Sequence, residues 1–360
     1  MRGLGSLCGA FLLSVWAVSS SPVQQTVPRP AVPIDPITAI IDAFRAHALV
    51  ALGEAAHSGQ QDQAFRLSLV RDPRFAGTVN DIVVERGNAR YQDLMDRFVR
   101  GEDVAPEVLR HVWQDTTGLT EEFDIGFSEE FFRAVRAANA SLPRERQIRV
   151  LLGDPPIEWE NVRTFADVLE WGDRRDQHAA EIIQREVLAK QHRGLVIYGR
   201  AHFQRQNERT NFETADFLAG MLDRAGASLF TIWTTVGAAE LATLPNEIAS
   251  WRVPSLALLK GTDLGSLDYQ AYSRSMDTRL ARRDGRLTPI PRDQWRPMHM
   301  EDQFDALLYL GPTLTSVGLP PALCADADYL QMRTQRMALA PDGQGNVSRL
   351  RRYCAAQVPR

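Results

Sequence analysis

The chain has 360 residues, with 41 lysines and arginines against 45 aspartates and glutamates, which gives a formal net charge of −4. Its 44% hydrophobic and 24% charged residues are ordinary values for a globular protein and exclude a disordered, collagen-like or coiled-coil chain. The mild acidic excess argues against a nucleic-acid-binding protein, because such proteins normally carry a basic domain.

The first 19 residues have the pattern of a secretory signal peptide. Arg2 precedes an apolar run over residues 4–18, which is shorter than the roughly 20 residues that a membrane span needs. Small residues follow at the position of a cleavage site. We therefore expect an exported protein, periplasmic or extracellular, with no membrane span in the mature chain. An uncleaved membrane anchor is the alternative.

The three cysteines are too few for a disulfide-rich scaffold. Cys8 lies in the expected signal peptide, whereas Cys324 and Cys354 lie near the C-terminus. In an exported protein these last two can form a lasting disulfide. Two unpaired, buried cysteines are the alternative.

Short apolar runs alternate with helical patterns after a proline-rich linker over residues 20–36. The predicted strands cover residues 48–52, 81–84, 148–152, 195–198, 229–233 and 306–310. The predicted helices cover residues 37–46, 60–71, 87–99, 105–114, 128–140, 174–191 and 212–225. Continuous apolar runs are typical of strands that are buried on both faces. The pattern predicts an α/β fold with a mostly parallel central sheet flanked by helices.

We expect one α/β domain over residues 37–319. It contains a helical insertion after the second strand, at about residues 86–147, and an irregular, lid-like segment at about 252–303, where glycines and prolines gather. A helical tail is expected over residues 320–360.

Polar and charged side chains follow four of the predicted strands. They are Glu54 and His57 after the first strand, Glu85 and Arg86 after the second, Asp154 after the third, and Arg200 and His202 after the fourth. Ligands of open parallel sheets bind beyond the carboxyl ends of the strands, so these groups are expected to meet at one rim. A single acid after a strand is ordinarily a helix cap or a turn residue. Several carboxylates in one place, however, cost stability, and with two histidines they suit proton transfer or metal ligation.

Several common catalytic motifs are absent from the sequence. It contains no Gly-x-Gly-x-x-Gly, no phosphate-binding Gly-x-x-x-x-Gly-Lys-Ser/Thr, no Gly-x-Ser-x-Gly and no His-Glu-x-x-His. A dinucleotide-binding fold, a phosphate loop and a standard serine hydrolase elbow are therefore not supported.

The stretch Gly53-Glu54-Ala55-Ala56-His57-Ser58-Gly59 resembles the Gly-Glu-x-x-His-Gly signature of the erythromycin esterase family. It is also similar to motifs of the ChaN-like haem-binding proteins and the Tiki-type metalloproteases. Gly199-Arg200-Ala201-His202 matches the Gly-x-x-His pattern of the Tiki branch. The resemblance covers about residues 45–235 and does not distinguish the branches. Ser58-Gly59 stands where the family has a glycine directly after the histidine.

The resemblance implies Glu54 and His57 as catalytic or ligand residues, with Glu85 and His202 as their partners. The leading interpretation is an exported hydrolase that activates water against an ester, lactone or amide of a small-molecule or peptide substrate. His57 is the expected general base, and Glu54 or Glu85 orients its ring. His202 is the expected general acid or a second orienting group.

The remaining residues of the predicted site have less defined roles. Arg200 or Arg86 is expected to stabilise the oxyanion, and Asp154 is grouped with the catalytic residues. No obligatory cofactor is expected.

Two alternatives use the same residues. Two histidines and two or three carboxylates can hold Zn²⁺ or Mn²⁺ with an open position for water, as in a Tiki-like metal-dependent protease. A ChaN-like haem-binding protein without catalysis would ligate iron through His57, His202 or the triplet Met298-His299-Met300.

Aromatic side chains of the insertion are expected in the core, and the substrate is partly apolar if they line a pocket. They are Trp113, Phe123, Phe127, Phe131 and Phe132.

Overall fold

The computed structural model describes residues 27–120, 124–205, 217–269, 280–283, 286–289, 291 and 298–357. The expected signal peptide, the first part of the linker and Phe123 lie outside these residues. Within the described part of the chain, no helix is both long and apolar enough to cross a bilayer.

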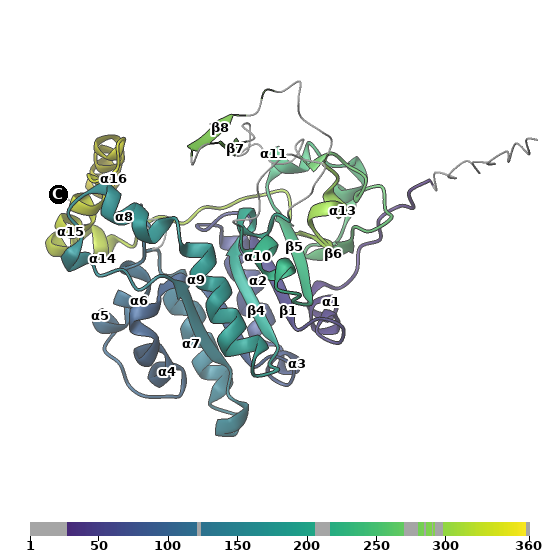
Figure 1. Cartoon of the computed structure of the whole chain (residues 1–360), viewed down its shortest axis with the longest axis horizontal. Coiled ribbons are helices and arrows are strands. Elements are labelled where there is room, and N and C mark those ends of the chain that lie inside the picture. The colour runs from purple at the N-terminus through teal and green to yellow at the C-terminus, as the bar shows by residue number, and fades with distance from the viewer. Residues whose placement is uncertain are drawn as a thin grey trace, which may run out of the picture.

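A seven-stranded sheet forms the centre of the molecule (Figure 1). Its strands are β1 (Leu49–Glu54), β2 (Asp81–Asn88), β3 (Arg149–Asp154), β4 (Gly194–Gly199), β5 (Leu229–Thr235), β6 (Ser255–Leu258) and β9 (Ala306–Tyr309). They lie in the order β3-β2-β4-β1-β5-β9-β6, and every neighbouring pair is parallel except β6 with β9. The predicted α/β fold class is thereby confirmed.

Each of the six predicted apolar runs coincides with one strand of this sheet, whereas the sequence does not predict β6. That strand has four residues, pairs antiparallel at the edge of the sheet, and lies in the stretch that was expected to be irregular. Part of the proline-rich segment lies along it, because the amide of Ile34 donates a hydrogen bond to the carbonyl of Leu256 at 2.8 Å. A separate hairpin consists of β7 (Leu280–Arg283) and β8 (Arg286–Pro289).

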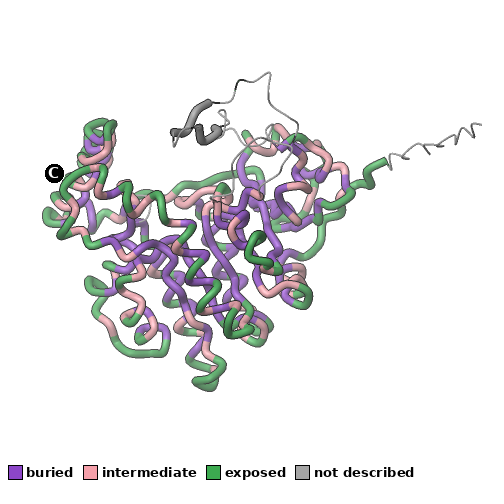
Figure 2. The backbone as a smooth tube through the Cα atoms, viewed as in Figure 1, coloured by how far each residue is buried: buried purple, intermediate pink, exposed green. Residues whose placement is uncertain are grey.

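Helices cover both faces of the sheet, and the strands between them are buried (Figure 2). One face carries α1 (Pro36–Ala43), α2 (Gln60–Arg71), α4 (Gln92–Val99) and α7 (Phe127–Asn139). The other face carries α9 (Arg175–Ile182), its π-helical continuation η5 (Ile183–Leu188) and α10 (Leu218–Arg224). Alternate residues of β1 supply the two cores, with Val50 and Leu52 on the first face and Leu49 and Ala51 on the second.

Short elements connect these layers. Helical turns between β2 and β3 are η1 (Ala89–Tyr91), α5 (Pro106–Leu109), α6 (His111–Gln114) and η3 (Arg144–Arg146), which together with α4 and α7 make up the helical insertion after the second strand. The others are α3 (Pro73–Ala76), η4 (Trp159–Asn161), α8 (Phe165–Gly172), η6 (Arg200–Phe203), α11 (Ala238–Leu241), η8 (Asn246–Ser250) and α13 (Met300–Gln303).

The C-terminal helices α14 (Pro321–Ala325), α15 (Ala327–Met337) and α16 (Gly343–Gln357) enclose a small apolar core of their own. A disulfide joins Cys324 to Cys354, so the paired alternative for the two cysteines is the one found. Arg333 of α15 forms a buried ion pair with Asp124 of the insertion, and the hydroxyl of Tyr329 donates to the same carboxyl group at 2.6 Å. The C-terminal helices are thereby fixed to the insertion.

The chain between β9 and α14 contacts the loop that carries His57. The amide of Gln60 donates to the carbonyl of Thr315 at 2.8 Å, and the amide of Val317 donates to the carbonyl of Ser58 at 2.9 Å. Backbone bonds from a distant segment therefore hold both sides of Gly59.

Candidate active site

Glu54 and His57 form a hydrogen-bonded pair where β1 ends and the chain turns towards α2. Nδ1 of His57 lies 2.9 Å from Oε2 of Glu54, and Arg66 of α2 forms an ion pair with the other oxygen of that carboxylate. Burial opposes the charge of Glu54, but Arg66 and Arg86 outweigh it and lower its pKa to about 2. Because an ionised carboxylate only accepts, Nδ1 of His57 is the donor, and a lone pair of the ring can be carried only by Nε2.

Glu85 of β2 lies between two imidazoles. Its Oε2 atom accepts a hydrogen bond from the amide of Gly199 at 2.7 Å and lies 3.8 Å from Nε2 of His57. Its Oε1 atom lies 2.7 Å from a guanidinium nitrogen of Arg175 and 3.5 Å from Nε2 of His202. Burial opposes the carboxylate, yet His57, His202 and Arg175 together hold its pKa well below the ordinary value.

His202 has an acidic partner of its own, which comes from α9. Nδ1 of His202 lies 2.6 Å from Oδ1 of Asp176, whose other oxygen accepts the amide of Leu218 at 2.9 Å. Burial disfavours the imidazolium, but the carboxylates of Glu85 and Asp176 outweigh burial and raise the pKa of His202 to about 10. His202 is therefore positively charged at neutral pH.

Asp154, at the end of β3, reaches this cluster through Arg175. Its oxygens accept hydrogen bonds from the amide and the hydroxyl of Thr117, both at 2.7 Å, and from Nε of Arg175 at 3.1 Å. Burial of the carboxyl group raises the pKa of Asp154 to about 6. Arg175 thus links Asp154 to Glu85.

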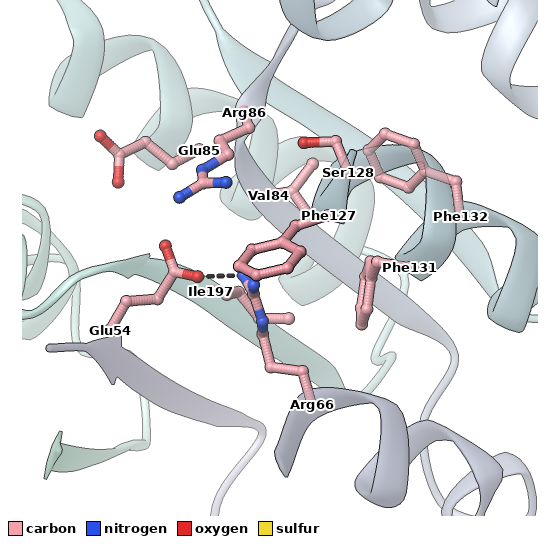
Figure 3. Close-up of a pocket in the computed structure, with 10 residues that line it drawn as sticks. All are labelled: Glu54, Arg66, Val84, Glu85, Arg86, Phe127, Ser128, Phe131, Phe132 and Ile197. Carbon is pink, nitrogen blue, oxygen red and sulfur yellow. Dashed lines mark hydrogen bonds and ion pairs between the residues drawn. The ribbon is translucent and has the colours of Figure 1, made fainter. Parts of the chain in front are cut away.

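The two arginines predicted to stabilise an oxyanion point in different directions. Arg86 lines the pocket beside Glu54 and Glu85 (Figure 3). It is buried and donates to the carbonyl of His57. Arg200 instead forms an ion pair with Glu240, donates to the carbonyl of Thr234 at 2.6 Å and lies 4.0 Å above the centre of the Trp233 ring. The structure therefore brings Arg86, but not the guanidinium of Arg200, to the carboxylates.

An apolar wall faces the carboxylates across the pocket (Figure 3). It consists of Phe127, Phe131 and Phe132 of α7 together with Val84 and Ile197 of the sheet. Ser128 of α7 also lines this pocket. Part of the aromatic set that was expected in the core thus borders the site as well.

The glycines at the ends of β1 and β4 allow close packing of the site. A Cβ atom on Gly199 would lie 3.2 Å from Cε1 of His57, and one on Gly53 would lie 2.7 Å from Cβ of Arg200. The absence of a side chain at these two positions therefore lets His57 and Arg200 approach the strand ends.

A metal ion has suitable donor atoms in the cluster but an unfavourable charge environment. Glu54, His57 and Glu85 each offer one donor atom, and these atoms lie within 4.8 Å of one another. Arg66 and Arg175, however, already form ion pairs with the two carboxylates. These guanidinium groups pair with Oε1 of each carboxylate and leave Oε2 facing His57, so the cluster could hold Zn²⁺ or Mn²⁺, with an affinity that the nearby positive charges lower.

The alternative iron ligands near residue 299 are enclosed by the fold. Met298 and Met300 are 3% and 1% exposed and belong to the apolar core around α10 and β9. The side chain of His299 caps α13. Of the residues considered for haem, only His57 and His202 lie at the rim of the sheet.

The sequence did not single out Arg66, Arg175 or Asp176, because they come from helices and not from strand ends. No local sequence signal identifies them. Gln63 and Arg66 of α2 are three positions apart, but only the structure shows that both are buried. Buried polar residues on one face of a helix are typical of a helix that borders a site.

No known family model matches the chain, and no curated protein matches it significantly. Solved structures with a similar fold include a Bacillus cereus protein, at 12% identity over 81% of this chain and 97% of that one, with a TM-score of 0.48. They also include a mutant of the erythromycin esterase EreC in its open conformation, at 12% identity over 78% of this chain and 94% of that one, with a TM-score of 0.46. The fold resembles theirs.

A further similar structure is haem-bound ChaN of Campylobacter jejuni, at 10% identity over 56% of this chain and 86% of that one, with a TM-score of 0.35. The similar structures thus include members of two of the groups that the motif around His57 resembles, erythromycin esterases and ChaN. They do not separate these branches.

Proposed function

We propose that the protein is a hydrolase resembling the erythromycin esterases, which activates water against an ester, lactone or amide bond. The hydrogen bond from Nδ1 of His57 to the ionised Glu54 carries this proposal. A histidine fixed in this way presents the lone pair of Nε2, as a general base requires. The side chain of His57 is 23% exposed, which gives water access to the ring.

The proposed reaction needs two proton transfers. Nε2 of His57 takes one proton from water while the water oxygen attacks the carbonyl carbon, and the resulting tetrahedral oxyanion is stabilised by the positive charges of His202 and Arg86. Collapse of this intermediate breaks the bond to the leaving group, which takes the proton from His57. The products of an ester are the acid and the alcohol. Glu54 stabilises the imidazolium that forms on His57 between the two transfers.

We also propose export of the protein, on the basis of the signal-peptide pattern. The disulfide between Cys324 and Cys354 supports an oxidising compartment. Mass spectrometry of the mature N-terminus tests this proposal. A mature protein that still begins at Met1 contradicts cleavage of the expected signal peptide.

A screen of esters, lactones and amides with the full-length protein tests the hydrolase. His57→Ala should lower kcat/KM by about 10²–10⁴-fold. The matched control is His192→Ala, because His192 forms the same kind of pair with Asp81 at 2.7 Å, at the amino end of β2. Its activity should be unchanged. Hydrolysis that survives in His57→Ala, or that falls equally in His192→Ala, contradicts the proposal.

Two further measurements separate the alternatives. Activity that is lost on dialysis against a chelator and restored by Zn²⁺ or Mn²⁺ would favour the metal-dependent protease. A Soret band on haem titration that His57→Ala abolishes, without hydrolysis of any substrate, would favour the haem-binding protein.

A further inference from the structure

A buried aspartate of α2 contacts the turn that carries the proposed base. Asp62 is 4% exposed, and its Oδ1 atom accepts a hydrogen bond from the amide of Ala55 at 2.9 Å. Ala55 directly follows Glu54 and precedes His57 by two residues. The carboxylate of Asp62 therefore holds the backbone between the two members of the acid–base pair.

The second oxygen of this carboxylate is buried without a hydrogen bond. Oδ2 of Asp62 has no hydrogen-bond partner among the residues that the structure describes. A buried carboxyl group with an unpaired oxygen is costly, and the nearby charge of Glu54 adds to the cost. Stability alone does not account for an aspartate at this position, whereas a role in the site does.

Gly59 leaves the room that this carboxylate occupies. Its φ of −74° and ψ of 119° are open to any residue, so the backbone itself does not require a glycine there. A Cβ atom on Gly59, however, would lie 2.6 Å from Oδ2 of Asp62 and 3.0 Å from the carbonyl oxygen of Ala56. The glycine that follows Ser58, where the chain departs from the Gly-Glu-x-x-His-Gly signature, therefore makes space for Asp62.

The carbonyl groups of the turn are fixed by other partners. The amide of Gly59 donates to the carbonyl of Ala56 at 2.9 Å. Arg86 donates to the carbonyl of His57. Asp62 supplies the matching contact on the amide side of the turn. A shift of about 1 Å in a catalytic group can slow a reaction by about a hundredfold, so this contact bears on the rate.

We propose that Asp62 is a positioning residue for His57: its carboxylate fixes the turn through the amide of Ala55, and Gly59 leaves the space that the carboxylate needs. The inference rests on the proposed function for its effect on rate, whereas the contacts themselves do not depend on the reaction. Asp62 takes no part in proton transfer.

Steady-state kinetics of ester hydrolysis tests the role of the carboxylate. Asp62→Ala removes the acceptor and should lower kcat about 10–100-fold, with little change in KM. Asp62→Asn keeps an acceptor oxygen for the amide of Ala55, so its kcat should stay within about threefold of wild type. The matched control is Asp72→Ala, because Asp72 accepts the amide of Arg74 at 2.9 Å in the same way, at the other end of α2. Its kcat should be unchanged.

Gly59→Ala tests the same contact from the other side, and it does so even if Asp62→Ala folds poorly. The added methyl group displaces Oδ2 of Asp62, so this variant alone should lower kcat about tenfold. In the Asp62→Ala background that space is empty, and Gly59→Ala should then lower kcat by less than about threefold.

Hydrogen exchange of the Ala55 amide, measured by NMR, follows the turn without any substrate. The amide should be protected in wild type and in Asp62→Asn, and should exchange at least about tenfold faster in Asp62→Ala. This exchange pattern in a protein that hydrolyses no ester leaves the contact of Asp62 assigned and removes the hydrolase.

Four results overturn the inference. They are a wild-type kcat in Asp62→Ala, an Asp62→Asn variant as slow as Asp62→Ala, equal losses from Gly59→Ala in both backgrounds, and an Ala55 amide whose exchange Asp62→Ala leaves unchanged. Any of these in a protein whose hydrolysis still requires His57 removes the role of Asp62 and leaves the proposed function in place.

Discussion

The imidazole of His57 donates from Nδ1 to Oε2 of Glu54 over 2.9 Å, although only two residues separate the two in the chain. The turn after β1 makes this contact possible, and the ion pair with Arg66 prevents the carboxylate from rotating away. The orientation of the ring is therefore set by charge as well as by packing.

Glu54→Gln should lower kcat of ester hydrolysis by about 10²–10⁴-fold and change KM little. The amide carries no charge to stabilise an imidazolium on His57, and it leaves Arg66 without its anionic partner. Steady-state kinetics measures both constants. Asp81→Asn is the control, because it alters the equivalent pair with His192 at the other end of the sheet. If Glu54→Gln raised KM and left kcat unchanged, Glu54 would bind substrate and would not assist His57 as a general base.

Asp154→Asn should change how stability depends on pH. Burial raises the pKa of Asp154 from its ordinary 3.8 to about 6, so between these values the folded protein holds a proton that the unfolded chain has lost. This contribution to stability is fully present below about pH 4 and is lost as the pH rises through 6. Asparagine does not titrate, so the free energy of unfolding of the variant, relative to wild type, should rise by roughly 1–3 kcal/mol over this window.

Urea unfolding of both Asp154 proteins between pH 4 and pH 7 gives this difference. Other acids, including Asp62 with its pKa also raised to about 6 by burial, are common to both proteins and cancel. A difference that stays constant across the window would show that Asp154 is ionised in the folded protein throughout.

Removal of divalent metal should leave hydrolysis unchanged. Arg66 and Arg175 neutralise the carboxylates that a cation would need, so they lower the affinity of the site for one. The measurement is kcat/KM before and after dialysis against a chelator, with metal analysis of the protein. A fall of tenfold or more that added Zn²⁺ reverses would contradict this expectation.

Arg333→Ala should destabilise the protein by about 3–5 kcal/mol. The substitution leaves Asp124 buried without its cation, and breaking one side of a buried pair is costly. Urea unfolding measures the effect. Arg349→Ala, at an exposed arginine of α16, is the control and should change stability by less than about 0.5 kcal/mol. Near-equal values for the two variants would show that the pair of Arg333 with Asp124 does not stabilise the folded protein.

The strands and the strand-end residues of the site could be predicted from the sequence, because each is marked by a short stretch of neighbouring residues. Continuous apolar runs identify the parallel strands, and the strand-end rule selects Glu54, Glu85, Asp154 and both rim histidines, which the fold brings into one chain of contacts. The sequence does not predict β6, because an edge strand of four residues has little apolar periodicity.

Other contacts of the site depend on packing between distant elements. Arg66 and Asp176 reach the rim only through the rotation of α2 and α9 on the sheet, which no short motif encodes. Arg200 follows a strand as predicted, but Glu240, forty positions further on, draws its guanidinium away. Long, flexible side chains are placed by partners that a strand-end rule does not consider.

The backbone hydrogen bonds between the His57 loop and residues 315–317 join the site to a segment outside the sheet. The last of the seven strands ends at Tyr309, so a complete sheet alone does not hold this loop in place. We therefore expect the His57 loop to work only when residues 315–317 are in place. Val317→Pro, which removes the amide that donates to Ser58, tests this: it should keep the circular dichroism of an α/β protein and lose most of the hydrolysis.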